Sequence, residues 1–474
     1  MGLRSRLNSI FKGQEEFDLT SGDVGKPLFF LALPIVVTNL FQTAYNLADT
    51  FWLGQYSTDA LAAISFGFPM VFLLISLGMG LSVAGSVLVA QHTGAGEQRE
   101  AEYAAGQTVT FAAIASALLG GIGYFFVEDF LRLLGASQDV LPLATSYMEV
   151  IALGLAFMFG FFVFIALMRG YGDTITPMLV MFGSVVLNIV IDPFLIFGWW
   201  VFPEMGIQGA AIATVFSRAL AMVVGLAIMF EGSRGIEIHL RDMAPDFGYL
   251  RRLLRIGLPA TIEGTGRALS MNLLLIVVAL FSDTVVAAYG IGTRVFSVIF
   301  LPAIAVARGV ETMTGQNIGA GKPDRAEAAT GIAAKVLFGV LTAAGIVTWF
   351  TASAIADVFT TDPAVVSVTT EFLRYVALTF GFIGIMRAYT GSFRGAGKTL
   401  TAAAISVLML GIIRLPVAWF SAQSIGETGI WLAFAVSNVI GATIAYLWYR
   451  RGTWRDADLT ESEAASPDAA ATDD

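Results

Sequence analysis

The sequence predicts an all-α integral membrane protein, with twelve transmembrane helices in two six-helix lobes that are related by a pseudo-twofold axis. The first observation is composition, because 56% of the 474 residues are hydrophobic and 13% are charged, too few charges to cover soluble domains. Second, uncharged windows of about 20 residues or more, long enough to cross a ~30 Å hydrocarbon core, recur along the whole chain. Third, the second half of the chain repeats motifs of the first half.

The predicted spans are the windows from which charged residues are nearly absent. A β-barrel is rejected because its strands alternate in polarity over about ten residues, whereas Ala60 to Gln91 is one uncharged stretch. In chain order, the predicted spans are 27–54, 60–91, 103–127, 139–168, 174–198, 205–230, 251–281, 284–318, 326–357, 364–392, 398–420 and 427–449.

Arginine and lysine residues predict the side of the membrane that each loop faces, because short cytoplasmic loops are rich in basic residues. With the N-terminus inside, Arg99, Arg169, Lys322 and almost all other basic loop residues fall on the cytoplasmic side, and Arg132 alone falls outside. We therefore expect a multi-pass protein of the cell (plasma) membrane with both termini in the cytoplasm. Residues 1–25 contain charges and no apolar core, so we expect no secretory signal.

The spans and loops divide the chain into five predicted segments. The last of them contains seven Asp and Glu residues among Ala, Ser and Thr, which contribute to the net charge of −9 and predict disorder. The segments are a cytoplasmic N-terminal segment (1–26), an N-lobe (27–230), a cytoplasmic linker (231–250), a C-lobe (251–449) and an acidic, disordered C-terminal tail (450–474).

An internal repeat is visible when the chain is aligned with itself at an offset of 225 residues. Pro34 then pairs with Pro259, and Gly94-Ala95-Gly96 pairs with Gly319-Ala320-Gly321. Each copy holds an even number of helices, so both copies enter the membrane from the same side and are related by an axis along its normal. Two such lobes around a cavity are typical of alternating-access transporters. The alternative is an inert bundle that arose by duplication.

Two acidic residues inside predicted spans are the strongest candidates for function. A charge near the middle of a membrane costs at least ~2.5 kcal/mol, so an intramembrane carboxylate is a functional candidate by default. Asp49 lies about 8 Å below the outer end of its helix and Asp192 lies about 9 Å below the end of its own, at ~1.5 Å per residue. This common depth predicts that they meet. The alternative is structural, with Asp49 capping a helix end and Asp192 preceding a kink at Pro193.

Polar partners are predicted beside both aspartates. Tyr45 and Asn188 each lie four residues before one of them, one helical turn deeper on the same face, and Thr214 reaches a similar depth on the next helix. Carboxylate, amide and hydroxyl oxygens suit a hard cation, and two close buried carboxyl groups favour proton uptake. We therefore expect a cation-coupling site for either H+ or Na+ that comprises Asp49, Asp192, Asn188, Tyr45 and Thr214, with sodium held by Asp49, Asn188, Asp192 and Thr214.

Two prolines are predicted to let helices bend. Pro34 and Pro259 lie inside the first and seventh spans, where each removes a backbone hydrogen bond. Because Pro34 and Asp49 share one helix, we expect loading of the carboxyl group to be linked to bending of that helix.

The remaining intramembrane charges are of two kinds. Those that can pair along one helix favour a structural role, and they are Glu263 with Arg267, Arg308 with Glu311, and Glu371 with Arg374. Those without a partner on their own helix are Arg218, Arg294 and Arg387. Glu263, Arg267 and Arg294 are retained as candidate cavity charges. Arg414-Leu415-Pro416 occupies the place in the second half that Asp192-Pro193 occupies in the first, so one lobe is acidic where the other is basic.

Several function classes are excluded by composition and spacing. The chain has no cysteine and only two histidines, which argues against thiolate, iron–sulfur and histidine-rich metal sites. The run from Ser392 to Thr399 has the lysine and threonine of a phosphate loop, but Ser392 replaces its first glycine and no strand precedes it. We therefore expect no ATP partner, no nucleic acid partner, no cofactor and no enzymatic activity.

These runs resemble the multidrug and toxic compound extrusion (MATE) family, and its archaeal and DinF-like branch in particular. The likeness extends over residues 20–452 and rests on the residues described above together with the runs Met168–Thr174, Asn188–Pro193 and Gly209–Thr214. The resemblance implies a V-shaped cavity and export of bulky, often cationic organic compounds, driven by inward flow of sodium or protons. It also implies that Pro34, Tyr45, Asp49, Asn188, Asp192 and Thr214 form the N-lobe site of that branch.

The chain departs from the NorM-like branch of the family at two places. That branch has a glutamate where this chain has Arg267, and an acid in the region that corresponds to Gly381–Met386, which has none. We therefore expect a cation-coupled antiporter whose partners are an organic small molecule, the coupling cation and membrane lipid. The alternative is a flippase for a lipid-linked oligosaccharide with a related two-lobe fold. A membrane-embedded enzyme is a weaker alternative from another class. Substrate identity and the choice between Na+ and H+ stay open.

Overall fold

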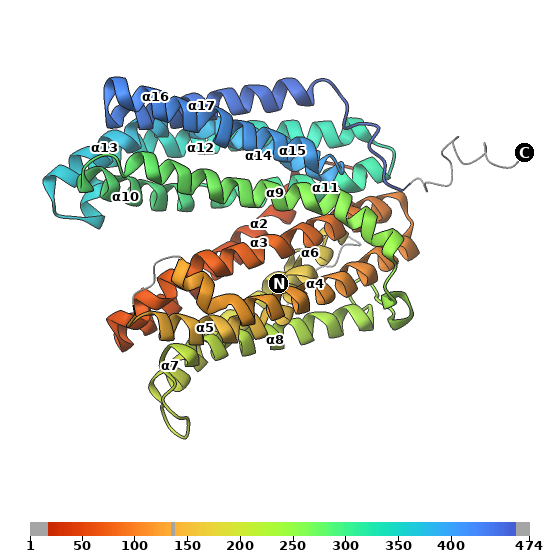
Figure 1. Cartoon of the computed structure of the whole chain (residues 1–474). Helices are drawn as coiled ribbons and strands as arrows, with labels where there is room; N and C mark the ends of the chain where they lie inside the picture. The colour runs from red at the N-terminus through yellow and green to blue at the C-terminus, as the bar shows by residue number, and fades with distance from the viewer. Residues whose placement is uncertain (1–17, 134–137, 461–474) are drawn as a thin grey trace, which may run out of the picture. The chain divides into compact units, whose positions relative to one another are not determined.

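A computed structural model describes residues 18–133 and 138–460, and helices form nearly all of this part of the chain (Figure 1). Parts of the predicted N-terminal segment and tail, residues 1–17 and 461–474, lie outside the described residues. The helices are α2 (Gly25–Tyr56), α3 (Thr58–Ala95), α4 (Gln98–Leu133), α5 (Leu141–Leu153), α6 (Leu155–Tyr171), α7 (Ile175–Phe197), α8 (Gly206–Glu231), α9 (Phe247–Val278), α10 (Asp283–Ile299), α11 (Leu301–Gly319), α12 (Pro323–Phe359), α13 (Pro363–Ala377), α14 (Phe380–Gly395), α15 (Thr399–Val407), α16 (Leu415–Ile425) and α17 (Glu427–Tyr449). Two shorter helices are η2 (Leu240–Met243) and the π-helix η3 (Leu408–Arg414).

The described helices cover all twelve predicted spans, although some spans contain more than one helix. Nine of them are long and apolar enough to cross a membrane, and this number rises to twelve when each of three bent pairs counts as one span. The bends are 53° between α5 and α6, 43° between α10 and α11, and 51° between α13 and α14. The prediction of continuous helices over 139–168, 284–318 and 364–392 was therefore wrong.

The bend between α10 and α11 has a clear cause in the sequence. Pro302 lies in the first turn of α11, where its missing N–H is not needed and where it cannot continue the preceding helix. At the first bend, Gly154 lies so close to Val215 of α8 that a side chain there would overlap it. An uncharged window contains no signal for such close packing, which is why apolar composition alone did not predict this break.

The chain divides into two compact units. Within the described residues, the first unit comprises Asp18, Leu33–Val89 and Glu97–Thr261, and the second comprises Leu19–Ala32, Ala90–Gly96 and 262–460. In the first unit, α8 packs against α5, α6 and α7, and α4 packs against α5 and α6. In the second unit, α14 packs against α11, α12 and α17. The core of the second unit is rich in aromatic rings, and the ring centroids of Phe372 and Trp431 are 4.1 Å apart.

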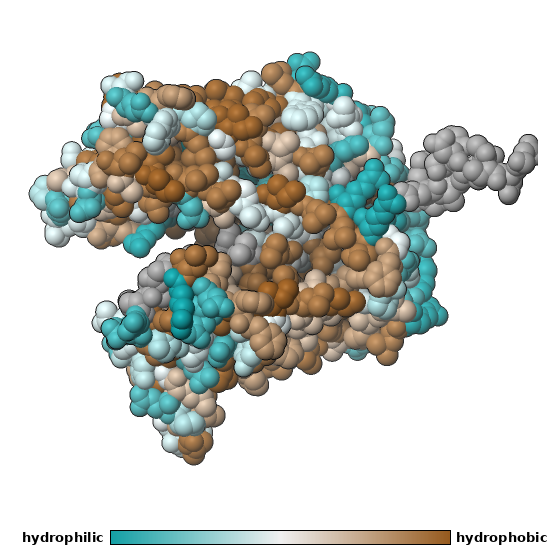
Figure 2. Space-filling view, in the orientation of Figure 1, coloured by the Kyte–Doolittle hydropathy of each residue, from teal (hydrophilic) through white to brown (hydrophobic). Residues whose placement is uncertain are grey.

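The surface has the polarity expected of helices in a lipid bilayer. On the face seen in Figure 2, hydrophobic side chains cover the middle of the helices and hydrophilic side chains gather towards the helix ends. Phe125, Phe350 and Val358 are among the exposed large apolar side chains, with 79%, 72% and 80% of their surface accessible. Water would disfavour such exposure, whereas acyl chains accept it. The surface therefore agrees with a multi-pass membrane protein.

Two repeated glycines allow very close helix packing within the second unit. A Cβ atom on Gly94 would overlap the carbonyl oxygen of Gln316, and a Cβ atom on Gly319 would overlap the carbonyl oxygen of Gln91. The four residues are equivalent under the 225-residue repeat, so the two copies of this motif contact one another reciprocally. Only glycine fits at either position without moving the backbone.

Part of the predicted disordered tail is packed against the second unit, so that prediction was wrong for residues 454–459. Trp454 is only 1% exposed, and its indole ring stacks on Tyr449 with the centroids 4.6 Å apart. The side chain of Gln91 accepts a hydrogen bond from the backbone N–H of Leu459 at 2.8 Å. Burial of the indole supplies the apolar contact that the acidic composition of the tail as a whole lacks.

The linker between α8 and α9 is fastened to α4 by a charged pair. The guanidinium of Arg99 donates two hydrogen bonds to the carboxylate of Asp242, at 2.6 and 2.5 Å. The side chain of Gln107 donates to the backbone carbonyl oxygen of Asp242 at 2.6 Å. The Arg99 guanidinium holds the pKa of Asp242 below its usual value.

This pair predicts a pH-dependent contribution to stability. A lowered pKa in the folded state means that Asp242 stabilises the fold above about pH 4, and that this contribution is lost as the pH falls through the lowered pKa. Asp242→Asn is expected to lower the melting temperature at neutral pH, and the difference from wild type should shrink towards acid pH. Thermal unfolding in detergent at several pH values measures this. A difference that does not change with pH would contradict the assignment.

Candidate functional site

The predicted cation site lies entirely within the first unit, where α2, α7 and α8 supply its side chains. The hydroxyl group of Tyr45 on α2 donates a hydrogen bond to Oγ1 of Thr214 on α8 at 2.5 Å. Both side chains are buried, with 6% and 3% of their surface exposed. The depth estimate from helix rise therefore brought together two residues that are 169 positions apart in the sequence.

On α7, the side-chain amide of Asn188 donates a hydrogen bond to Oδ1 of Asp192 at 3.1 Å. The two residues are one helical turn apart, as predicted, and neither has any accessible surface. The helix continues through Pro193 to Phe197. Asp192 therefore points into the unit rather than into lipid.

The two predicted acids meet. The carboxyl groups of Asp49 and Asp192 are close enough to share a hydrogen bond, which requires that one of them hold a proton. Asp49 is 5% exposed and lies seven residues before the last residue of α2, Tyr56. It does not cap a helix end, so the structural alternative for Asp49 was wrong.

Three oxygen atoms of this site are buried without a hydrogen-bond partner in the described part of the chain. They are Oδ1 of Asp49, Oδ1 of Asn188 and Oδ2 of Asp192. A buried acceptor that lacks a donor is costly, and a bound proton or cation would satisfy it. Within residues 18–133 and 138–460, no group of three or more His, Cys, Asp and Glu side chains forms a metal site. The arrangement instead offers two carboxylates together with amide and hydroxyl oxygens, which fits a small hard cation or protons.

Arg218 is the residue of this site that the sequence did not assign. It is 2% exposed, it donates a hydrogen bond to Oε1 of Gln42 at 2.8 Å, and its guanidinium lies 4.7 Å from the centroid of the Tyr45 ring. A buried cation near Asp49 offsets part of the negative charge of that residue. The sequence spacing could have predicted this position, because Arg218 follows Thr214 by four residues and so lies on the same face of α8.

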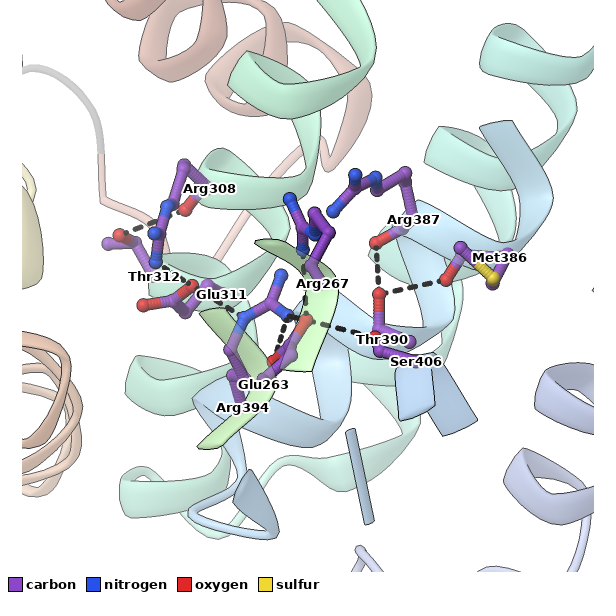
Figure 3. Close-up of polar contacts among 10 residues, drawn as sticks. All are labelled: Glu263, Arg267, Arg308, Glu311, Thr312, Met386, Arg387, Thr390, Arg394 and Ser406. Atoms are coloured by element: carbon purple, nitrogen blue, oxygen red, sulfur yellow. Dashed lines mark hydrogen bonds and ion pairs between the residues drawn. The ribbon is translucent and has the colours of Figure 1, made fainter. Parts of the chain in front are cut away.

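In the second unit, the predicted pair of Glu263 and Arg267 is present, with the charged groups 3.3 Å apart (Figure 3). The pair of Arg308 and Glu311 is also present, at 2.9 Å. Arg394, which the sequence placed in a loop, contacts both carboxylates, Glu263 at 3.1 Å and Glu311 at 3.2 Å. These residues form one network rather than separate pairs, in which Glu263, Glu311 and Arg394 are buried.

The other predicted charges lie apart from this network. Arg294 is exposed on α10. Glu371 accepts a hydrogen bond from Thr428 at 2.7 Å, whereas Arg374 lies over the Trp349 ring at 5.3 Å. Glu371 and Arg374 thus have different partners. The prediction that they pair was wrong, because tertiary contacts outcompete an i, i+3 ion pair of small energy.

Pro34 and Pro259 lie inside α2 and α9, at equivalent positions of the repeat. Each is close to a place where the chain passes from one unit to the other, between Ala32 and Leu33 and between Thr261 and Ile262. Whether the two helices bend there stays a prediction.

Comparison with known proteins gives consistent results. A MatE family model matches residues 34–194 and 259–420. The chain is 28% identical to a FAD transporter of Shewanella oneidensis over 92% of its length and 97% of that protein. It is also 28% identical to the probable multidrug resistance protein YpnP of Bacillus subtilis, over 94% of this chain and 98% of that one.

Solved structures agree with the fold. The Vibrio cholerae MATE transporter VcmN in its bent form is 25% identical, with a TM-score of 0.86 over 92% of this chain and 98% of that chain. An outward-facing multidrug resistance MATE family transporter has a TM-score of 0.85 at 24% identity, over 93% of this chain and 98% of that chain. The predicted all-α class with twelve transmembrane helices in two lobes is confirmed. The chain therefore belongs to the MatE family of transporters, which move small molecules across membranes and are not enzymes.

Proposed function

We propose that this transporter is a cation-coupled antiporter that exports bulky, often cationic organic compounds by alternating access, and that H+ or Na+ is loaded in the N-lobe. The observation that carries the proposal is the meeting of Asp49 and Asp192. Each of them, and Asn188 beside them, has one buried oxygen that lacks a hydrogen-bond donor within the described residues. The family relatives that are named as multidrug resistance proteins support the substrate class. The FAD transporter of Shewanella oneidensis extends that class to larger compounds.

The coupling follows from the cost of buried charge. Two carboxylates at close range cannot both be ionised in a low-dielectric site without a large repulsion, and uptake of a cation or a proton relieves it. Loading would therefore change the contacts of Asp49 on α2, and this helix also contains Pro34. A helix with one missing backbone hydrogen bond bends at lower cost than an intact one. Ion loading and bending of α2 are thus linked through one helix.

The direct test uses proteoliposomes loaded with the cationic dye ethidium. Dye efflux is measured under a sodium gradient and, separately, under a pH gradient, with vesicles without protein as the control. We expect one of the two gradients to accelerate efflux and the other to have no effect. Efflux that responds to neither gradient would overturn the coupling proposal. If the same vesicles translocate a lipid-linked oligosaccharide and not the dye, the protein is a flippase instead.

The proposed topology places the protein in the cell membrane with both termini in the cytoplasm. The distribution of Arg and Lys among the loops supports it. Protease accessibility of tags at the two ends in right-side-out vesicles tests it.

Tyr45→Phe is expected to weaken cation use without abolishing it. The variant removes the hydroxyl group that donates to Thr214 at 2.5 Å, and it keeps the ring beneath Arg218. Loss of one neutral hydrogen bond is worth about 1 kcal/mol, so the cation concentration that gives half-maximal efflux should rise about fivefold. Tyr124→Phe on α4, an exposed residue, is the matched control. An unchanged cation dependence would remove Tyr45 from the site.

A further inference from the structure

We propose that a cavity inside the second unit binds aromatic organic anions, so that the substrates of this transporter include anionic compounds. The inference rests on the proposed transport function and adds a substrate class to it. The cavity has a volume of about 360 Å³, and its wall includes three arginines, Arg267, Arg387 and Arg414. Small-molecule sites commonly have volumes of this size, an apolar wall and a few converging polar groups.

The charges around this cavity do not balance. The two carboxylates of the network, Glu263 and Glu311, are shared among Arg267, Arg308 and Arg394. Glu263 also accepts a hydrogen bond from Ser406 at 3.0 Å. With Arg387 included, four guanidinium groups lie near two carboxylates. The network therefore has an excess of positive charge on the cavity side.

Among the residues that the structure describes, Arg387 forms no ion pair, and the nearby Glu263 is already paired with Arg267 and Arg394. Its Nε atom is buried and has no hydrogen-bond partner within the described part of the chain. Figure 3 shows its guanidinium pointing towards that of Arg267, while Glu263 lies below Arg267 in the view. Two like charges that face one another in a partly buried space repel, and an anion between them would remove the repulsion.

Arg414 adds a third positive charge to the same cavity. Its guanidinium donates hydrogen bonds to Ser437 at 2.9 Å and to Asn438 at 2.8 Å, and lies 4.3 Å from the centroid of the Phe434 ring. These partners are all neutral, so the positive charge of Arg414 is held in place without being compensated. The cavity thus has arginines of α9, α14 and η3 in its wall.

The rest of the wall selects the kind of anion. It is lined by aromatic and sulfur-containing side chains, among them Tyr289, Phe296, Phe300, Met271 and Met409. Rings pack against such a wall, and thioethers adapt to differently shaped partners. An inorganic anion would leave this surface uncovered. A compound with an aromatic ring and a phosphate, sulfonate or carboxylate group would use both the ring surface and the arginines.

The test measures binding by equilibrium dialysis to the full chain in phosphatidylcholine nanodiscs, with empty nanodiscs as the blank. Three naphthalene probes differ in charge: 1-naphthyl phosphate, neutral 1-naphthol and cationic 1-naphthylmethylammonium. We expect the phosphate to bind at least about tenfold more tightly than the other two, which corresponds to one charge-assisted hydrogen bond. Equal binding of all three probes would overturn the proposal.

Variants assign the effect to this cavity. Arg387→Gln and Arg414→Gln are each expected to weaken 1-naphthyl phosphate about tenfold and to leave 1-naphthol unchanged. Arg294→Gln on α10 removes the same charge outside the cavity wall and is the matched control. Arg387→Gln loses no ion pair, so its melting temperature without probe should equal or exceed that of wild type. Unchanged phosphate binding in both cavity variants would overturn the proposal.

Two further arms separate this inference from its alternatives. Asp49→Asn should bind 1-naphthyl phosphate like wild type, because Asp49 belongs to the other unit, so a failure of cation coupling leaves this result standing. Nanodiscs that contain phosphatidylglycerol test whether a lipid phosphate fills the cavity. Binding that persists in them supports a soluble organic anion. Binding that disappears would show that the arginines hold lipid and would overturn the proposal.

Discussion

Replacing Asp49 by Asn is expected to reduce cation-driven efflux to the level of vesicles without protein. The amide has the size of the carboxyl group but neither binds a proton at physiological pH nor offers a negative charge to sodium. Asp49 is 5% exposed, and one of its oxygens has no hydrogen-bond donor within residues 18–133 and 138–460. The substitution therefore removes the charge while it keeps the packing.

The same assay includes three comparisons. Asp59→Asn changes the same group at an exposed position at the start of α3, and should leave efflux unchanged. Asp192→Asn should match the loss of Asp49→Asn. The double variant should be no worse than either single one, because groups that act as a unit are not additive. Undiminished efflux by Asp49→Asn, at equal amounts of folded protein, would remove this residue from the coupling site.

Gly319→Ala is expected to cause the largest loss of stability, about 1–3 kcal/mol. The added methyl group would overlap the backbone oxygen of Gln91, and a backbone carbonyl cannot rotate away as the end of a side chain can. Alanine is the better helix former, so helix propensity would predict a small gain instead. The expected sign therefore depends on the close contact alone.

Gly331→Ala on α12 is the matched control, because a Cβ atom there meets nothing within 4 Å. It should leave the melting temperature unchanged or raise it slightly. Thermal unfolding in detergent compares both variants with wild type, and the measured quantity is the fraction of protein that stays monodisperse after heating. Gly94→Ala should behave like Gly319→Ala, since it meets the equivalent carbonyl of Gln316. A melting temperature of Gly319→Ala equal to that of Gly331→Ala would contradict the close contact.

The regular geometry of a membrane-spanning helix made it possible to predict both the positions of the spans and the residues of the cation site from the sequence. A membrane span is long, nearly free of charge and regular in rise, so depth follows from counting residues. Asp49 and Asp192 were placed at one depth in this way, and Thr214 was placed one turn deeper, near Asn188. In the structure Asp49 approaches Asp192, and Thr214 bonds to Tyr45. Counting fails where the helix is interrupted. The bends at Gly154 and Phe300 depend on local packing and on Pro302, and an uncharged window does not reveal either.

Contacts between distant parts of the chain were harder to predict. Arg394 is in a segment that looks like a loop in the sequence, yet it contacts both Glu263 and Glu311, 131 and 83 residues away. Trp454 lies in an acidic segment, and its burial depends on Tyr449. No periodicity marks either contact. The lack of a partner on its own helix nevertheless identified Arg387 in the sequence as a residue of interest, and Arg387 lies in the wall of the cavity of the second unit.

The second unit is assembled from segments that are far apart in the sequence, and this has a consequence for how the chain is synthesised and folded. Asn317 donates a hydrogen bond to the backbone oxygen of Leu19, 298 residues earlier, and Gln91 donates to that of Gly395, 304 residues later. The early segments thus leave the ribosome long before their partners exist, and must wait unpaired at the insertion machinery. If the gene is split near η2, each half expressed alone should accumulate poorly. Co-expression of the two halves in one cell should restore a complete protein.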